Sequence, residues 1–499
     1  MEDKFKRLQE LFAEIDDLNR AADVLRWDHM TNMPSGGTRA RGHQIGTISR
    51  VAHEKLTSPE VGRLLENLSG ANGFARDSWQ AGLIRKAKRE FEKATKIPSA
   101  MVEEESNLRA QSHLSWEKAK HEADFMIFSD DLKRSVEWQQ RYARLFEPYE
   151  HVYDPFLDNY EPGLKTSEIR SLFAGLRKKQ VALVKKIGKK PQVDNSFLHQ
   201  AFDEDKQWET GKMAVTSLGY DWEKGRMDKV AHPFSVTLGF GDVRITNKVD
   251  PGFFNTLFFA NLHETGHALY EQGLPEAYSR TPLFQGASMS VHESQSRLWE
   301  NHIGRSRPFW EFQLPILQVT FPGQFGDVDL DTFYKGINRV EPSPIRGQAD
   351  EATYNLHIMI RTELEIAMLE GSVNVDDLPD TWNRLMDEYL GVIPENDAEG
   401  VLQDAHWAHG SFGYFPTYAL GNLIAAQIWR QLQSDLQDID SHLRQGNFSE
   451  ILSWLRSKIH IHGAVFEPQD LIERVTGSRL NEDDYLSYLN KKYGEIYNL

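Results

Sequence analysis

The chain contains no cysteine. Disulfides and thiolate-ligated zinc are therefore excluded, and a metal site has to use histidine and carboxylate side chains. There is no run of about 18 apolar residues, so no transmembrane helix is expected. The first residues, Met1 to Arg7, are mostly charged and lack the apolar stretch of a secretory signal. We therefore expect a cytoplasmic protein.

Basic residues are not in excess. The sequence has 57 Lys and Arg against 74 Asp and Glu, and its formal net charge is −17. Because nucleic-acid binding needs clustered positive charge, we expect no nucleic-acid partner. No repeat or linker divides the 499 residues. We expect one domain over 1–499, with helical walls over about 1–230, a central core over about 231–420 and C-terminal helices over 421–499.

Most of the chain has helical periodicity. Apolar residues from Phe5 to Leu25 recur with a period near 3.6, and the pattern breaks at Asn32–Gly37. Ser58 and Pro59 begin a further helix, and others are expected over 75–97, 99–125, 129–147 and 166–187. Ser235–Gly239 and Asp242–Thr246 alternate and are predicted to form a short β-hairpin. The hairpin is either purely structural or offers an edge strand to an extended peptide.

The segment His263-Glu264-Thr265-Gly266-His267 has the pattern H-E-x-x-H. On a helix, histidines four residues apart share a face and can bind one metal ion. Glu264 lies about 100° around the helix, where a general base would meet a metal-bound water. The preceding residues, Phe253–Leu262, are strongly apolar, so we expect the helix to be buried rather than on the surface.

A catalytic zinc site needs a third protein ligand outside this motif. Glu293 is our first choice, because a loop after Gly273 leaves room for a second helix to pack against the first. His292 and Glu300 are the competing candidates. Spacing alone does not choose among the three.

Five further motifs lie before and after H-E-x-x-H along the chain. They are H-P-F (His232–Phe234), D-x-R-x-T (Asp242–Thr246), H-E-S-Q (His292–Gln295), I-R-x-x-A-D (Ile345–Asp350) and G-x-x-Q-D-x-H-W (Gly400–Trp407). Together with H-E-x-x-H, this set resembles the carboxypeptidase Taq family of zinc metallocarboxypeptidases.

The resemblance implies several further properties. The fold would be mainly α-helical, a single metallocarboxypeptidase catalytic domain with a deep substrate groove, similar to neurolysin and angiotensin-converting enzyme. The members are usually homodimers that remove single residues from peptide C-termini with broad specificity. They use Zn²⁺, with Co²⁺ as a substitute. The resemblance also implies Glu293 as the third ligand beside His263 and His267.

Glu264 is expected to act as the general base in the attack of a metal-bound water on the scissile carbonyl. The oxyanion needs further donors, and His406 and Tyr414 are our candidates, with Tyr418 as an alternative to Tyr414. Packing roles for His406 and Tyr414 are the competing interpretation.

An exopeptidase has to recognise a terminal carboxylate, which the arginine fork matches best. Arg346 is the first choice and Arg244 the second. Gln403 is a further candidate for substrate binding. Arg346 could instead pair with Asp350, and Arg244 with Asp242. Gln403 and Asp404 could also be acceptors that orient the ligand histidines.

Two other functions are compatible with H-E-x-x-H. One is an oligopeptide endopeptidase on the same scaffold, which only carboxylate recognition and product analysis would distinguish. The other is a non-catalytic peptide-binding protein, which an altered Glu264 or a missing ligand would indicate. Neither change is present in the sequence.

Overall fold

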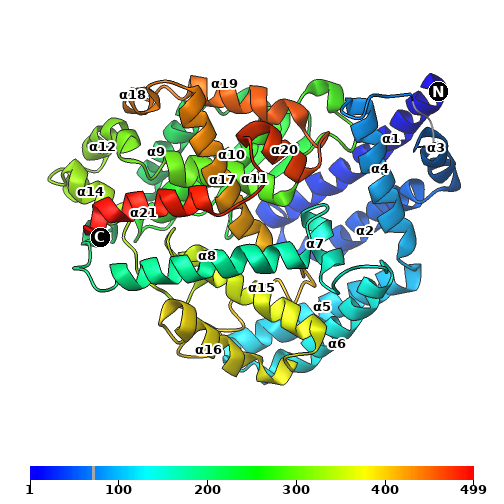
Figure 1. The fold of residues 1–499 in the computed structure, drawn as a ribbon, viewed down its shortest axis with the longest axis horizontal. Coiled ribbons are helices and arrows are strands. Elements are labelled where there is room, and N and C mark those ends of the chain that lie inside the picture. The colour runs from blue at the N-terminus through cyan, green and yellow to red at the C-terminus, as the bar shows by residue number, and fades with distance from the viewer. Residues whose placement is uncertain (70–72) are drawn as a thin grey trace. The chain divides into compact units, whose positions relative to one another are not determined.

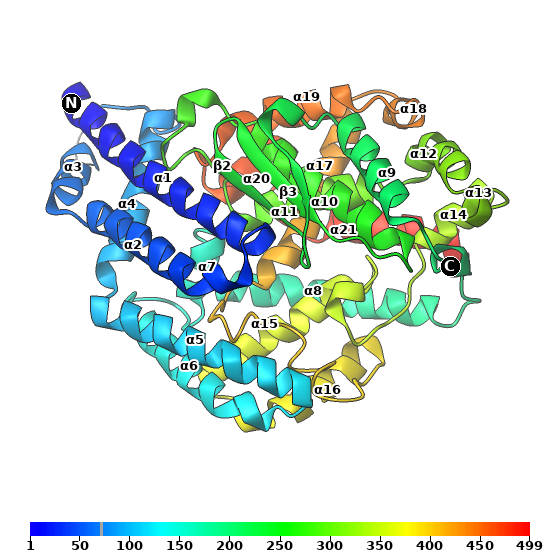
Figure 2. The same cartoon turned by 180° about the vertical axis from the view of Figure 1, so that it is seen from behind.

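The computed structural model describes residues 1–69 and 73–499, which are mostly helical (Figure 1), with one small sheet that is visible from behind (Figure 2). This confirms the predicted mainly α class. Within these ranges, no helix has both the length and the apolar character that a bilayer span requires. The residues form two compact units: unit 1 contains Met1–Thr95, Asp194–Ile337 and Gln427–Arg479, and unit 2 contains Lys96–Val193, Asn338–Ala426 and Leu480–Leu499. The single catalytic domain and the deep groove stay predictions.

Unit 1 contains the H-E-x-x-H segment. Its helices are α1 (Glu2–Thr31), α2 (Thr38–Leu56), α3 (Pro59–Ser69), α4 (Trp79–Lys96, whose last residue is in unit 2), α9 (Glu204–Ser217), α10 (Phe254–Gln272), α11 (Met289–Arg297), α12 (Arg307–Thr320), α13 (Pro322–Phe325), α14 (Leu330–Ile337), α18 (Ile439–Arg444), α19 (Ser449–Lys458) and α20 (Pro468–Thr476). A π-helical segment, Leu298–Ile303, continues α11.

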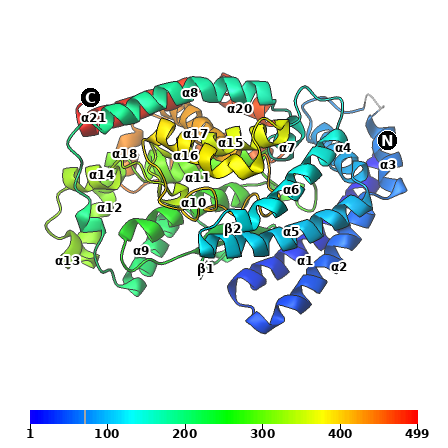
Figure 3. The same ribbon diagram turned by 90° about the horizontal axis from the view of Figure 1, so that it is seen from below.

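The apolar stripe of α1 is buried from Phe5 to Ile15, as its periodicity predicts, whereas Leu18 and Leu25 are only half-buried. Phe5, Leu8, Leu11, Phe12 and Ile15 belong to one core cluster with side chains of α3 and α4. Helices α1 and α2 run side by side (Figures 2 and 3). Helices α1, α3 and α4 therefore share one core within unit 1.

The predicted hairpin is present beside α1 and α10 (Figure 2). Strands β2 (Phe234–Gly239) and β3 (Asp242–Asn247) pair antiparallel, with Val236 opposite Arg244. A third strand, β1 (Met227–Lys229), pairs parallel with β3 and was not predicted. The strand order β1-β3-β2 leaves β2 at an edge of the sheet, where Arg20 donates a hydrogen bond to the Thr237 carbonyl at 2.8 Å.

Helix α10 is held by its apolar surface rather than by a cap, since its N-cap residue Phe253 makes no side-chain capping bond. Phe254, Phe258 and Phe259 are all buried, as the apolar composition predicts. Their rings pack on aromatic side chains that include Trp310 and Phe321. This packing fixes the helix that presents the two histidines.

Gly266 lets α11 approach α10 closely. A Cβ atom added there would lie 2.6 Å from the Gln295 carbonyl oxygen and 2.6 Å from the Ser296 Cα. Both are backbone atoms, so they cannot rotate away. The glycine in the middle of H-E-x-x-H thus sets how near Glu293 comes to the histidines.

Replacing Gly266 by alanine is expected to lower the free energy of unfolding by about 1–3 kcal/mol, because the added methyl overpacks two backbones. The metal affinity expected of the H-E-x-x-H site should fall too, since Glu293, its predicted third ligand, moves with α11. Chemical denaturation of the metal-free protein and chelator competition measure the two effects. Gly46→Ala is the matched control: it adds the same methyl in helix α2 with nothing within 4 Å, and should raise stability by about 0.5–1 kcal/mol. Equal behaviour of the two variants would contradict the close-approach argument.

Unit 2 contains α5 (Ser99–Glu122), α6 (Met126–Arg144), α7 (Asp154–Tyr160), α8 (Thr166–Ile187), α15 (Tyr354–Glu370), α16 (Leu378–Leu390) and α21 (Asp483–Tyr497), while α17 (Pro416–Asp435) has residues in both units. Helices α5 and α6 lie side by side (Figure 3). The buried Glu365 accepts hydrogen bonds from the Tyr153 hydroxyl, the Trp407 indole and the Gly413 backbone N–H. These bonds fix the irregular segment between α16 and α17, which carries His406.

Candidate active site

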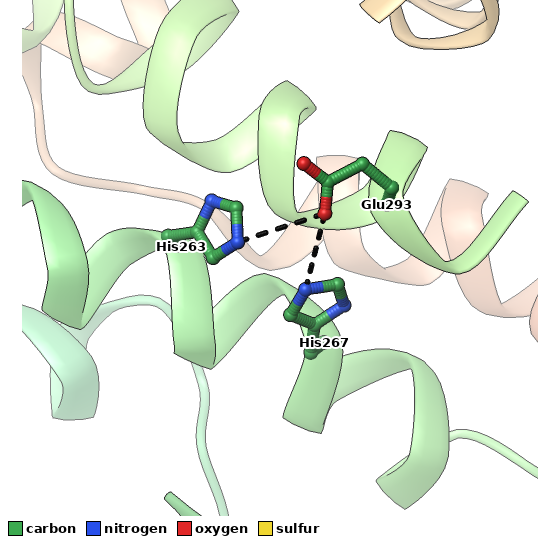
Figure 4. A group of neighbouring side chains, drawn as sticks. All are labelled: His263, His267 and Glu293. Carbon is green, nitrogen blue, oxygen red and sulfur yellow. Dashed lines mark ion pairs between the residues drawn. The ribbon is translucent and has the colours of Figure 1, made fainter. Parts of the chain in front are cut away.

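His263 and His267 on α10 face Glu293 on α11 (Figure 4). The Glu293 Oε2 atom lies 3.6 Å from His263 Nε2 and 3.4 Å from His267 Nε2. One ligand atom from each residue falls within 4.8 Å of the others. Two imidazole nitrogens and one carboxylate oxygen converging at this spacing fit a divalent cation with one position left for water.

Glu300, a competing candidate for the third ligand, lies behind His263. Its Oε2 atom is 2.9 Å from His263 Nδ1, the ring nitrogen opposite the converging atoms. When this nitrogen donates its proton to the carboxylate, the Nε2 lone pair is available to a metal. The π-helical segment after α11 carries Glu300 to this place.

His292, the other competing candidate, lies behind His267. The two Nδ1 atoms are 2.6 Å apart, and His292 Nε2 is 2.8 Å from Glu271 Oε1. The Thr237 hydroxyl of β2 donates to the second oxygen of Glu271 at 3.1 Å. If each ring donates toward Glu271, the His267 Nε2 atom keeps its lone pair. The hairpin thus connects to His267 through two side chains, Glu271 and His292.

Glu264 is buried on α10, with 7% of its surface exposed. Burial raises the pKa of its carboxyl to about 7; His263 opposes this rise and Glu293 adds to it. The Glu293 carboxylate is also buried, but Arg297 and the two histidines hold its pKa well below the usual range. Two carboxylates in one site therefore differ in basicity, and Glu264 is the better proton acceptor.

Arg346 lies in unit 2 and pairs with Asp404. Its Nε and Nη2 atoms are 3.1 and 2.7 Å from Asp404 Oδ1, and Arg361 Nε is 2.6 Å from Oδ2. Burial opposes ionisation of Asp404, yet the two guanidinium groups hold its pKa well below the usual range. The alternative partner, Asp350, instead accepts backbone N–H groups, including that of Glu341. The pairing of Arg346 with Asp350 is therefore wrong.

Gln403 holds the segment that carries Arg346. Its Oε1 atom accepts the Arg346 backbone N–H at 2.8 Å, and its amide nitrogen donates to backbone carbonyls, including that of Pro344 at 3.0 Å. The Gln403 side chain thus makes its hydrogen bonds to backbone groups. Direct contact between Gln403 and a substrate stays a prediction.

His406, Tyr414 and Tyr418 are neighbours in unit 2. The His406 Nε2 atom is 3.3 Å from the Tyr418 hydroxyl, and the Tyr414 ring packs edge-on against Tyr418 at 5.2 Å. Burial lowers the pKa of His406 to about 4, although Asp404 opposes the shift. The imidazole is therefore neutral near pH 7. The guanidinium of Arg346 lies 5.3 Å from the Tyr418 ring centre, so the first-choice arginine belongs to the same cluster.

Arg244 on β3 forms an ion pair with Asp242, which was the alternative to binding a substrate carboxylate. Its Nε and Nη2 atoms are 2.8 and 2.7 Å from the two oxygens of Asp242. The guanidinium also stacks 4.3 Å from the ring centre of Trp27 on α1. Arg244 thus ties the hairpin to α1.

The whole chain matches known proteins. The model of the carboxypeptidase Taq (M32) metallopeptidase family matches residues 7–493. The chain belongs to this family. Carboxypeptidase 1 of Bacillus subtilis is 41% identical over 99% of this chain and 98% of its own length. Thermostable carboxypeptidase 1 of Thermus thermophilus is 39% identical over 99% of both chains.

A solved structure agrees with the family assignment. The M32 carboxypeptidase of Deinococcus radiodurans superimposes with a TM-score of 0.97 at 35% identity, and the match covers 100% of both chains. The protein is therefore a metallocarboxypeptidase, a peptide hydrolase that depends on a metal ion. Among the residues that the structure describes, His263, His267 and Glu293 form a group that could hold a metal ion.

Sequence reasoning missed Arg297 and Glu271. Arg297 is four residues after Glu293 and three before Glu300, so all three share a helix face, and this spacing could have identified it. Glu271 is likewise four residues after His267 on α10, but its bond to His292 joins α10 to α11, and spacing does not show that bond.

Proposed function

We propose that the metal is Zn²⁺, with Co²⁺ as a substitute, held by His263, His267 and Glu293. The observation that carries this proposal is the convergence of two imidazole nitrogens and one carboxylate oxygen beside the buried Glu264. A chain without cysteine offers the nitrogen and oxygen donors of catalytic zinc sites. When bound, the ion supplies Lewis acidity and lowers the pKa of a coordinated water to about 7.

Glu264 is the general base in this proposal. Its raised pKa makes it a stronger proton acceptor than an exposed carboxylate, so it takes a proton from the attacking water. It then delivers that proton to the leaving amine. Glu293, with its depressed pKa, stays ionised and cannot perform this task.

His406 and Tyr414 are proposed to donate hydrogen bonds to the developing oxyanion, with Tyr418 as the alternative to Tyr414. A neutral His406 has an N–H that can donate without the cost of burying a cation. The position of the Tyr418 hydroxyl beside His406 Nε2 supports Tyr418 as a candidate oxyanion donor.

Arg346 is proposed to bind the terminal carboxylate of the substrate. Asp404 is shared by Arg346 and Arg361, so this trio carries one uncompensated positive charge. Arg244, by contrast, is neutralised by its own Asp242. The charge balance favours Arg346 and leaves Arg244 as the second choice, with Gln403 fixing the Arg346 backbone.

Metal-loaded protein is expected to convert a free-ended peptide into a ladder of products that lose single residues from the C-terminus, visible by mass spectrometry. Amidation of the same peptide removes the carboxylate and should stop cleavage. Metal analysis should find about one Zn²⁺ per chain, as for a three-ligand catalytic site, and the His263→Ala variant should lose it. Equal cleavage of amidated and free peptides, or internal cleavage products, would contradict C-terminal recognition.

Broad specificity, a homodimer and a cytoplasmic location are also proposed. The first two rest on the family resemblance and the third on composition. Light scattering of the purified protein and a panel of peptides with different terminal residues test the dimer and the specificity.

A further inference from the structure

Arg297 lies between the two carboxylates that surround the metal group. Its Nε atom is 2.7 Å from Glu293 Oε1, and its Nη1 atom is 3.0 Å from Glu300 Oε2. The three side chains are only 12%, 8% and 13% exposed, so solvent does not compete for these bonds. One guanidinium group thus bridges both acids.

The bond to Arg297 gives the two oxygens of Glu293 different roles. Oε1 is held by Arg297, whereas Oε2 is the atom that faces His263 Nε2 and His267 Nε2. The Ser296 hydroxyl is 3.1 Å from Oε2, but lies closer, at 2.7 Å, to the Glu293 carbonyl oxygen. A carboxylate with one oxygen engaged in this way offers a metal a single donor atom.

The second arm of the bridge acts on His263. Glu300 Oε2 accepts from both Arg297 Nη1 and His263 Nδ1. A carboxylate held on one side by a guanidinium fixes the orientation of the imidazole on its other side. Arg297 thereby restrains two of the three ligand side chains, although it touches none of their converging atoms.

We propose that Arg297 is a positioning residue that makes Glu293 bind the metal through one oxygen and orients His263 through Glu300. The inference rests on the ligand set under Proposed function. It depends on the shape of the guanidinium fork and not on charge alone. Lysine keeps the charge but is a point donor that cannot hold both carboxylates in this geometry.

The test compares Arg297→Lys with the wild-type protein and with Arg305→Lys. Arg305 is the matched control because its Nη2 atom lies 3.6 Å from Glu300 Oε1, whereas His263 Nδ1 is bonded to the other oxygen, Oε2. Each protein is loaded with Co²⁺, whose visible absorption reports its coordination number, and the metal affinity is measured by competition with a chelator. We expect Arg297→Lys to bind metal about 10–100-fold more weakly, with a spectrum altered toward higher coordination as Glu293 binds through both oxygens. Arg305→Lys should keep the wild-type spectrum.

Glu300→Gln provides an independent arm should Arg297→Lys fail to fold, as judged by circular dichroism. It keeps the Arg297–Glu293 bond and weakens only the His263 arm, so affinity should drop about 10-fold with an unaltered Co²⁺ spectrum. Wild-type affinity and spectrum in Arg297→Lys, or wild-type affinity in Glu300→Gln, overturn the inference. Failure of the ligand set itself is distinguishable: then the wild type binds no ion, or His263→Ala retains it.

Discussion

Replacing Glu264 by glutamine is expected to lower kcat by about 10²–10⁴-fold, the contribution typical of general acid–base catalysis, while the metal stays bound. Glutamine has nearly the same shape but cannot accept a proton. Steady-state kinetics and metal analysis of the same preparation measure the two quantities.

The conservative variant Glu264→Asp sharpens this test. It keeps a carboxylate but withdraws it by one methylene, so it should retain more activity than Glu264→Gln. The pH profile gives a second readout, because activity requires the ionised carboxylate and falls as pH drops through the pKa of Glu264. That pKa is about 7 in the protein alone, and a nearby cation lowers it. Full turnover by the metal-loaded glutamine variant would remove Glu264 as the base.

Replacing Arg346 by lysine is expected to reduce kcat/KM on free-ended peptides by about 10–100-fold, equivalent to about 1.5–3 kcal/mol for a lost charge-assisted hydrogen bond. Lysine keeps the positive charge beside Asp404 but loses the fork that matches a carboxylate. The kinetics should be accompanied by a denaturation curve, because Arg346 also pairs with Asp404.

Arg244→Lys is the matched control, since Arg244 is the second candidate and also forms a two-point ion pair with an aspartate. A large loss in Arg244→Lys with little change in Arg346→Lys would exchange their roles. A drop in stability of Arg346→Lys with unchanged kcat/KM would make its ion pair purely structural.

Local sequence patterns predicted the elements that are stabilised by their own periodicity. The α1 stripe from Phe5 to Ile15 and the β2–β3 hairpin both follow from spacing. Strand β1 escaped because its three residues, Met227 to Lys229, show no alternation and exist as a strand only through pairing with β3. Such an element depends on a distant partner that no local pattern describes.

In the candidate site, too, local patterns predicted some features, whereas others depend on distant partners. H-E-x-x-H predicted a shared face for His263 and His267, but the sequence alone left the third ligand open among His292, Glu293 and Glu300. All three lie close to the histidines, and only the orientation of each ring and carboxylate separates them. Likewise the partner of Arg346 is 58 residues away at Asp404, a pairing that depends on tertiary structure.

His263 and His267 have hydrogen-bond partners of different kinds. His263 donates to an anion, Glu300, whereas His267 is bonded to another imidazole, and a bond between two ring nitrogens requires one of them to be unprotonated. Proton donation to an anion leaves more electron density on the far side of a ring than donation to an uncharged acceptor. In the proposed metal site, the His267 nitrogen would therefore bind the cation more weakly than the His263 nitrogen.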